Sequence, residues 1–155
     1  MNKYKRNQKQ NQRINRITEN TLVVGADIAK KTHVARAIDY RGIELGKECV
    51  FHNDQEGLMK LALWMEKLGQ EHQKTDVVLG IEPTGHYWFP LAAFLKGKDI
   101  KVVGVNPHHV NKTKDIEDNS QTKSDYKDAK VIADLVRNGK YTEPNLPTKE
   151  YADLR

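Results

Sequence analysis

The sequence has 155 residues, of which 37% are hydrophobic and 30% are charged. This length allows one domain with a real core and short appendages. The longest uncharged segment, residues 83–95, is too short and too interrupted by proline to span a bilayer, and the first residues lack the apolar centre of a signal peptide. We therefore expect a cytoplasmic protein. The single Cys49 excludes internal disulfides and thiolate zinc sites.

The excess positive charge lies at the start of the chain. Of the 26 basic and 21 acidic residues, six and one fall within residues 1–20, which leaves 20 of each in the remainder and accounts for the net charge of +5. The segment is also rich in Asn and Gln, so we expect a flexible basic arm. Two interpretations are open: contact with the phosphates of a nucleic acid, or a solubilising extension with no partner.

Three strands joined by short turns are expected next. Residues 22–28 form an apolar run that ends near the carboxylate of Asp27, and residues 32–38 alternate as a hairpin partner does. Gly42 marks a second turn, and residues 43–51 predict a third strand, with Ile43 facing inward. These strands form an antiparallel meander.

Helices and strands alternate in the middle of the chain. Asn53 or Asp54 caps the first helix, Glu82 ends the following strand, and Pro90 is tolerable only within the first turn of the second helix. The spacing of apolar residues predicts, in order, a helix over 54–68, a strand over 76–82, a helix over 88–95 and a strand over 100–105.

The last third of the chain is less regular. Residues 106–122 are polar and predict a short helix at most, followed by a mobile loop. Residues 124–138 are again helical, with Gly139 as terminator. Residues 141–155 read as a linker and the start of a helix that leads to a further C-terminal domain. We therefore expect a fragment of a longer protein.

This order of elements is that of the ribonuclease-H-like fold. We expect residues 21–140 to form an α/β domain with a five-stranded mixed sheet and helices on both faces. The first strand lies in the middle of that sheet, next to the fourth, because a strand that follows a crossover helix usually runs parallel to its predecessor.

Four acidic residues stand where these elements can converge. Asp27 and Glu82 end two strands, whereas Asp125 and Asp128 lie three residues apart on one helix and continue its apolar face. With that helix packed on the sheet, the four carboxylates raise one another's pKa unless divalent cations neutralise them. Carboxylate oxygens suit Mg²⁺ or Mn²⁺, and a pair of such ions supports phosphodiester cleavage.

Three of the four acids also have a structural interpretation, whereas Asp128, one turn deeper in the helix, has less reason for one. Asp125 near a helix start complements the helix dipole, Asp27 caps the turn before Lys30, and Glu82 pairs with a basic neighbour such as His86. Both interpretations stay open for any single acid. The succession of two strand acids and a helical acid pair favours one shared metal site.

The residues around these acids resemble the DEDD transposases of the insertion-sequence-110 class, which include the Piv-type DNA invertases. The likeness runs from Thr21 to about Leu154, and Ser124 stands where threonine is commoner. Four motifs carry it in the family's order: GADIAK at 25–30, EPTGHYW at 82–88, VNP at 105–107 and KSDYKDA at 123–129.

The resemblance implies both a chemistry and a set of partners. In that family four acids hold divalent metal on a fold similar to the Holliday-junction resolvase RuvC, which assigns Asp27, Glu82, Asp125 and Asp128 here as catalytic metal ligands for Mg²⁺ or Mn²⁺. It also implies a C-terminal domain with a serine involved in strand cleavage, transposon-end and target DNA as substrates, and a guide noncoding RNA, the bridge RNA. A homo-oligomer of the full-length protein, associated with the bacterial nucleoid, completes this expectation.

Basic residues near the acids are candidates for phosphate contacts. Solvated surface lysines are the alternative for the lysines, and a turn cap is the alternative for the histidine. The candidates are Lys30, Lys31, His86, Lys123, Lys127 and Lys130.

Three functions follow from these expectations. The first is the catalytic domain of a DNA transposase or recombinase that cleaves and transfers DNA strands within an RNA-guided assembly. The second is a RuvC-like Holliday-junction or structure-specific nuclease, which hydrolyses and does not rejoin. The third is a noncatalytic nucleic-acid-binding module in which the acids are structural.

Overall fold

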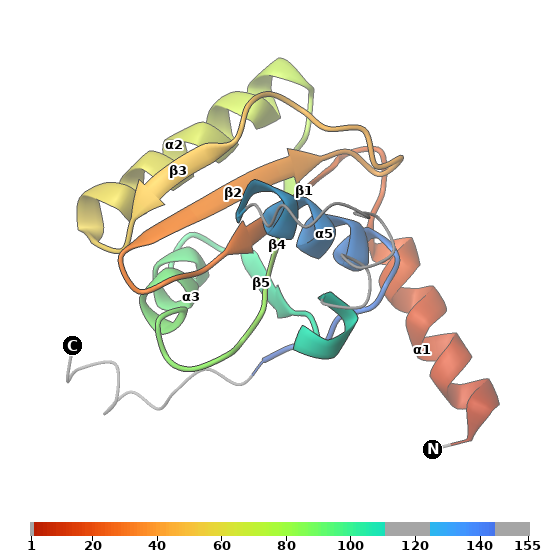
Figure 1. Ribbon diagram of the computed structural model, residues 1–155. Helices are drawn as coiled ribbons and strands as arrows, with labels where there is room; N and C mark the ends of the chain where they lie inside the picture. Colours follow the sequence, from red (N-terminus) through yellow and green to blue (C-terminus); the bar gives the residue numbers. More distant parts are fainter. Residues whose placement is uncertain (1, 111–124, 145–155) are drawn as a thin grey trace.

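The computed structural model describes residues 2–110 and 125–144, and for residues 125–127 it describes the backbone alone. The predicted succession of three strands followed by alternating helices and strands is confirmed (Figure 1). The elements are α1 (Lys3–Arg16), β1 (Thr21–Asp27), β2 (Thr32–Ile38), β3 (Cys49–His52), α2 (Gln55–Glu71), β4 (Asp76–Ile81), α3 (Phe89–Lys96), β5 (Lys101–Gly104) and α5 (Asp125–Arg137).

The strands form one five-stranded mixed sheet in the order β3-β2-β1-β4-β5. β1 is antiparallel to β2, and β2 to β3, whereas β1 with β4 and β4 with β5 are parallel pairs. The first strand therefore lies at the centre beside the fourth, as the ribonuclease-H-like order predicts. The carboxyl ends of β1 and β4 consequently meet at one edge of the sheet.

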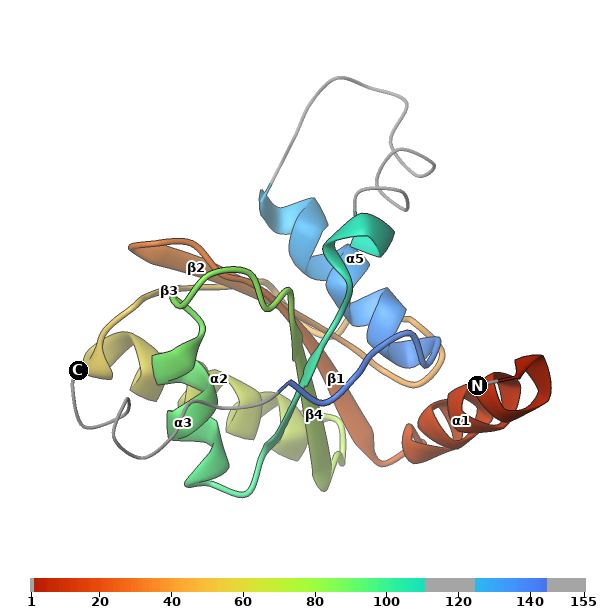
Figure 2. The same ribbon diagram turned by 90° about the horizontal axis from the view of Figure 1, so that it is seen from below.

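Helices cover both faces of the sheet (Figures 1 and 2). α2 and α3 pack on one face with Leu22 and Val24 of β1, while α5 packs on the other with Val23. Successive side chains of a strand point to opposite faces, so β1 is buried on both sides. This accounts for its nearly continuous apolar sequence.

Two glycines allow α5 to lie directly on the sheet. A Cβ on Gly25 of β1 would lie 2.1 Å from the carbonyl oxygen of Ala129, and a Cβ on Gly80 of β4 would lie 2.4 Å from Cγ2 of Val136. Any larger residue at these positions would displace the helix. The height and register of α5 over β1 and β4 are therefore set by these glycines.

The helix starts agree with the expected capping. Asp54 caps α2, because its Oδ1 accepts a hydrogen bond of 2.7 Å from the N–H of Gly57. Pro90 falls in the first turn of α3, as expected. Trp88 precedes α3, is buried, and donates its indole N–H to the carbonyl of Gly85 at 3.1 Å.

The third strand is shorter than predicted. Pairing with β2 is confined to Cys49–His52 and a single bridge between Ile38 and Glu44. Gly46 lies between these contacts with a φ of +70°, a left-handed conformation that interrupts the extended backbone. Ile43, expected to face inward, is 50% exposed.

The first twenty residues differ from the flexible arm that their composition suggests. Lys3–Arg16 form α1, which projects from the sheet at the lower right of Figure 1 and buries none of its residues. Its last turn is held by Arg16, whose Nη2 donates to Asp76 Oδ1 at 3.0 Å. Thr21 donates to the other oxygen of Asp76 at 3.0 Å. These partners are distant in sequence, so local composition does not reveal them.

Residues 107–110 form a helical turn that Asn106 caps, with the N–H of His108 donating to Asn106 Oδ1 at 2.8 Å. The expected mobile loop up to residue 122 and most of the expected linker over 145–155 lie outside the described residues. None of the helices in the described part of the chain has the length and apolar content needed to cross a membrane.

Candidate metal and nucleic-acid site

The sheet brings the two strand acids to the same place. β1 and β4 are parallel and pair Ala26 with Ile81, and the next residue on each strand is Asp27 or Glu82. Both acidic residues are half-buried at the carboxyl edge of the sheet. This is where the chain leaves two central strands and where ligands gather in open α/β sheets.

The turn after β4 fixes the backbone of Glu82. The N–H of Val105 donates to Ile81 O at 2.8 Å, and the N–H of Thr84 donates to Glu82 O at 2.8 Å. The Thr84 hydroxyl donates to Glu82 Oε1 at 3.2 Å. The Glu82 carboxylate, for which the sequence suggests His86 as a partner, thus accepts a hydrogen bond from a hydroxyl in its own turn.

The helix acids approach from the other layer. Asp128 is half-buried and its Oδ1 is shielded from solvent. The next residue, Ala129, touches β1 at Gly25, two residues before Asp27. The backbone of Asp125 begins α5, but its side chain lies outside the described part. The packing therefore places the start of α5 over the strand that carries Asp27.

Within the described residues, no three His, Cys, Asp or Glu side chains converge on a common point as a metal-ligating group. The sheet unites Asp27 with Glu82, and α5 crosses nearby. The convergence of all four acids stays a prediction, because the Asp125 side chain is not described. The donors that are present at this edge are carboxylate oxygens, the type that Mg²⁺ and Mn²⁺ prefer.

A buried histidine shapes the turn that follows Asp27. His33 is fully buried, and its Nδ1 accepts a hydrogen bond of 3.1 Å from the N–H of Ala29. Its ring meets Phe51 edge to face at 5.1 Å. Because Nδ1 accepts, the ring is neutral and carries its proton on Nε2. Burial lowers the pKa of His33, and the side chain of Asn53 only partly opposes this shift.

Asn53 joins the two turns that carry the strand acids. Its N–H donates to Lys31 O at 2.9 Å, and its Nδ2 lies 3.4 Å from Lys30 O and 3.5 Å from Tyr87 O. One side chain therefore spans the β1–β2 turn and the β4–α3 loop. The sequence offered Asn53 as a helix cap, but Asp54 takes that place, and only the fold reveals the bridging role.

The predicted phosphate-binding residues fall into three groups. Lys30 and Lys31 are exposed in the β1–β2 turn, and His86 is exposed in the β4–α3 loop with its ring 4.6 Å from that of Tyr87. Lys130 forms a 2.8 Å ion pair with Asp134 one turn along α5. The side chains of Lys123 and Lys127 lie outside the described residues.

Comparison with known proteins covers the segment that carries these residues. The insertion-sequence-110 DEDD family, described as transposase, matches residues 24–155. The pilin gene-inverting protein of Moraxella bovis is 36% identical over 114 residues, which are 71% of this chain and 32% of that protein. The protein of the same name from Moraxella lacunata is 35% identical over 114 residues, with the same shares. The chain thus spans about a third of the length of these relatives.

The family match covers most of the chain, including both strand acids and the helix with the acid pair. It confirms the resemblance drawn from the four motifs, and the mixed sheet agrees with the ribonuclease-H-like fold of these proteins. The chain belongs to the insertion-sequence-110 family of DEDD transposases.

Proposed function

We propose that this chain is the catalytic domain of a transposase or recombinase that cleaves and transfers DNA strands with divalent metal ions. One observation carries the proposal: Asp27 and Glu82 leave adjacent parallel strands at the same level, beneath the helix that bears Asp125 and Asp128. A shared metal site accounts for this placement, because it requires oxygen donors from several elements.

Mg²⁺, or Mn²⁺ in its place, fits the donors at this edge. Asp27, Glu82, Asp125 and Asp128 would hold two ions between them. Bound there, such ions activate the attacking oxygen and stabilise the leaving oxygen of a phosphodiester. The fixed spacing of β1 and β4 and the close contact of α5 with Gly25 support this proposal, because they would limit how far the carboxylates must move to bind metal.

The surrounding basic residues would position the DNA. Lys30, Lys31 and His86 are exposed on the two loops that follow the strand acids, where they can contact phosphates on either side of the reacting bond. Lys123 and Lys127, whose side chains lie outside the described residues, are proposed as further phosphate contacts on the strength of their sequence positions beside Asp125 and Asp128. Lys130 would contribute only after exchanging its Asp134 partner for a phosphate.

The remaining parts of the reaction are assigned to the larger protein. The matched relatives are about three times as long as the region of similarity, which leaves room for a domain that supplies the cleaving serine. A bridge RNA would select the transposon-end and target DNA by base pairing, and a homo-oligomer would hold both DNA partners. In this arrangement the chain supplies the metal site and serine attack comes from outside it.

A cleavage and joining assay tests the proposal. The full-length protein, its guide RNA and labelled donor and target DNA are incubated with Mg²⁺. We expect joined product that disappears in EDTA and in Glu82→Gln, but not in Asp99→Asn. Asp99 is an exposed acid between α3 and β5, at the opposite end of the sheet, and its φ of +59° suits Asn.

Each other outcome contradicts a named part of the proposal. Cleaved but never joined DNA would indicate a RuvC-like nuclease. Binding without any cleavage, unchanged in Glu82→Gln, would indicate a noncatalytic module.

A further inference from the structure

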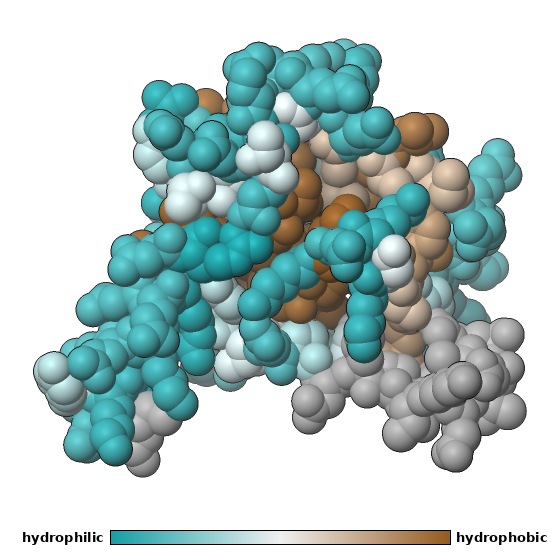
Figure 3. Space-filling view, turned by 180° about the vertical axis from the view of Figure 1, so that it is seen from behind, coloured by the Kyte–Doolittle hydropathy of each residue, from teal (hydrophilic) through white to brown (hydrophobic). Residues whose placement is uncertain are grey.

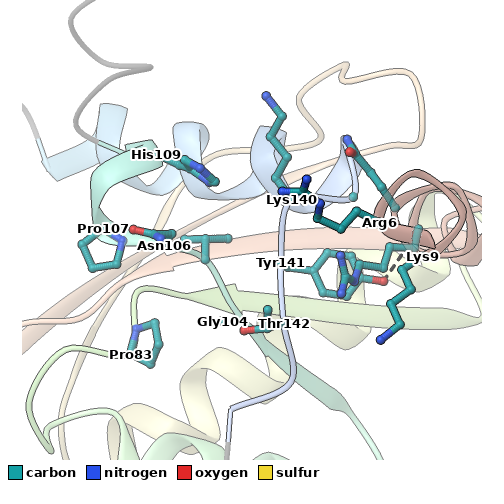
Figure 4. Close-up of a pocket in the computed structure, with 14 residues that line it drawn as sticks. Arg6, Lys9, Pro83, Gly104, Asn106, Pro107, His109, Lys140, Tyr141 and Thr142 are labelled. Atoms are coloured by element: carbon teal, nitrogen blue, oxygen red, sulfur yellow. Dashed lines mark hydrogen bonds between the residues drawn. The ribbon is translucent and has the colours of Figure 1, made fainter. Parts of the chain in front are cut away.

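A basic groove lies between α1 and the end of the domain (Figure 4). Its volume is about 630 Å³. Four cationic side chains line it, three from α1 and one from the segment after α5, and none of the described lining residues is acidic. The cations are Arg6, Lys9, Arg13 and Lys140.

The three cations of α1 share one side of the helix. Arg6, Lys9 and Arg13 are spaced by three and four residues, so they project in similar directions. They extend over about 10 Å at a rise of about 1.5 Å per residue. Figure 3 shows this helix covered with hydrophilic side chains, so its surface suits a charged partner more than an apolar one.

α1 is held in place by contacts with distant segments. Gln10 Nε2 donates to Asn138 O at 3.2 Å, and the Tyr141 hydroxyl donates to Arg13 O at 3.4 Å. A Cβ on Gly139 would lie 2.9 Å from Gln10 O, so the helix needs glycine there. With the Arg16 to Asp76 pair at its last turn, the helix forms one wall of a defined groove.

The cations that line the groove form no ion pairs with the described residues of the protein. Arg16, on the same helix, is bound to Asp76. Arg13 lines the groove, and its guanidinium carbon lies 5.9 Å from the centroid of the Tyr141 ring. Within the described part of the chain none of the four forms an ion pair, so they repel one another over the roughly 10 Å screening length at 0.1 M salt. A polyanion would remove that repulsion.

The groove begins next to the acid site. Pro83, which directly follows Glu82, lines it together with Asn106 and His109. A DNA strand that passes the acids would continue past Pro83 toward α1. One strand carries a charge every 3.4 Å or so of helix axis, so the cationic side of α1 matches about three phosphates.

We infer that this groove binds the phosphate backbone of the DNA strand on which the acid site acts. The inference rests on the proposed function and adds a partner-binding surface to it. The family match begins at residue 24, so one wall of the groove comes from a segment outside the matched region. In this chain α1 then contributes DNA contacts from outside the matched region.

Salt-dependent DNA binding tests the groove. A labelled 30-base-pair DNA of arbitrary sequence is titrated with the chain in EDTA, and log K is plotted against log salt. One variant combines Lys9→Gln with Lys140→Gln, one residue from each wall. The control combines Lys3→Gln with Lys5→Gln, which removes the same charge from exposed positions of α1 outside the groove. Glutamine keeps the helix propensity of lysine.

We expect the slope of log K against log salt to become less steep by about 2 in the groove variant, because each phosphate contact contributes about 0.9 to that slope. The control variant should leave the slope unchanged. Equal effects of both variants, or none, would overturn the inference. So would a loss seen with duplex RNA of the same length but not with DNA. The binding assay contains EDTA and no divalent metal, so its result does not depend on whether the acid site binds metal. Conversely, if the groove does not bind DNA, the cleavage assay still tests the metal site.

Discussion

Gly25 of β1 and Ala129 of α5 meet backbone to backbone. A Cβ on Gly25 would lie 2.1 Å from Ala129 O and 2.5 Å from the Ala133 nitrogen, closer than real Cβ contacts. Asp27 lies two residues after Gly25 on the strand, and Asp128 immediately precedes Ala129 on the helix. The contact therefore couples the position of the helix acids to that of the strand acid.

Gly25→Ala tests this coupling. The added methyl has no space, so we expect a loss of about 2 to 3 kcal/mol in the free energy of unfolding from overpacking, together with weaker Mn²⁺ binding by calorimetry. Gly97→Ala is the control, because Gly97 has a helical φ of −64° and its Cβ would meet its nearest neighbour at 3.4 Å. That change should alter stability by less than about 1 kcal/mol. Equal effects would show that α5 does not need the close contact.

Asn53→Ala tests the bridge between the two acid-bearing loops. The variant keeps the backbone bond to Lys31 but loses the side-chain contacts with Lys30 O and Tyr87 O. We expect a loss of about 1 kcal/mol and faster amide hydrogen exchange in residues 28–31 and 83–88. Asp54→Ala removes the α2 cap at a similar cost. The effect of Asp54→Ala should stay in the first turn of α2. Faster exchange in residues 28–31 and 83–88 of the Asp54→Ala variant would contradict a specific role for Asn53.

The pH dependence of stability tests the neutral state of His33. Burial keeps its pKa in the folded protein below the value of about 6.5 in the unfolded chain. The unfolded chain therefore binds a proton that the folded protein refuses. Above pH 6.5 His33 is neutral in both states, so its titration costs no stability. As the pH falls below that value, proton binding by the unfolded chain lowers the free energy of unfolding.

Chemical denaturation at pH 7.5 and 5.5 measures this effect. We expect the free energy of unfolding to fall less between these pH values in His33→Gln than in the wild type, because the substituted residue does not titrate. His72→Gln controls for loss of a histidine at a more exposed position. An equal pH dependence in the His33→Gln and wild-type proteins would contradict a buried neutral imidazole.

The sequence predicts the sheet well because the local pattern of apolar residues is enough to identify each central strand. β1 and β4 are short apolar runs that end in acids, and that local pattern gives both the strands and the edge at which Asp27 and Glu82 meet. The spacing of the apolar residues likewise predicts α5, whereas the role of its acid pair stays a prediction. Each of these signals is contained within a few consecutive residues.

The features that the sequence did not predict depend on distant contacts. α1 is anchored by Asp76 and seated against Gly139, more than fifty residues away in each case, so its composition alone suggests a flexible arm. Asn53 and Asp54 are both suitable caps, and nothing local indicates that one of them bridges two loops. The late start of the third strand, at Cys49, follows the left-handed backbone of Gly46, a conformation that many glycines do not adopt.

The most direct test is a crystal of this chain soaked in Mn²⁺ and measured at a wavelength where manganese scatters anomalously. We predict anomalous density bonded to the carboxylates of Asp27 and Glu82, with Asp128 turned toward it and the peak absent in Glu82→Gln. Manganese bound elsewhere, or Asp128 pointing away from both strand acids at saturating Mn²⁺, would contradict the shared metal site.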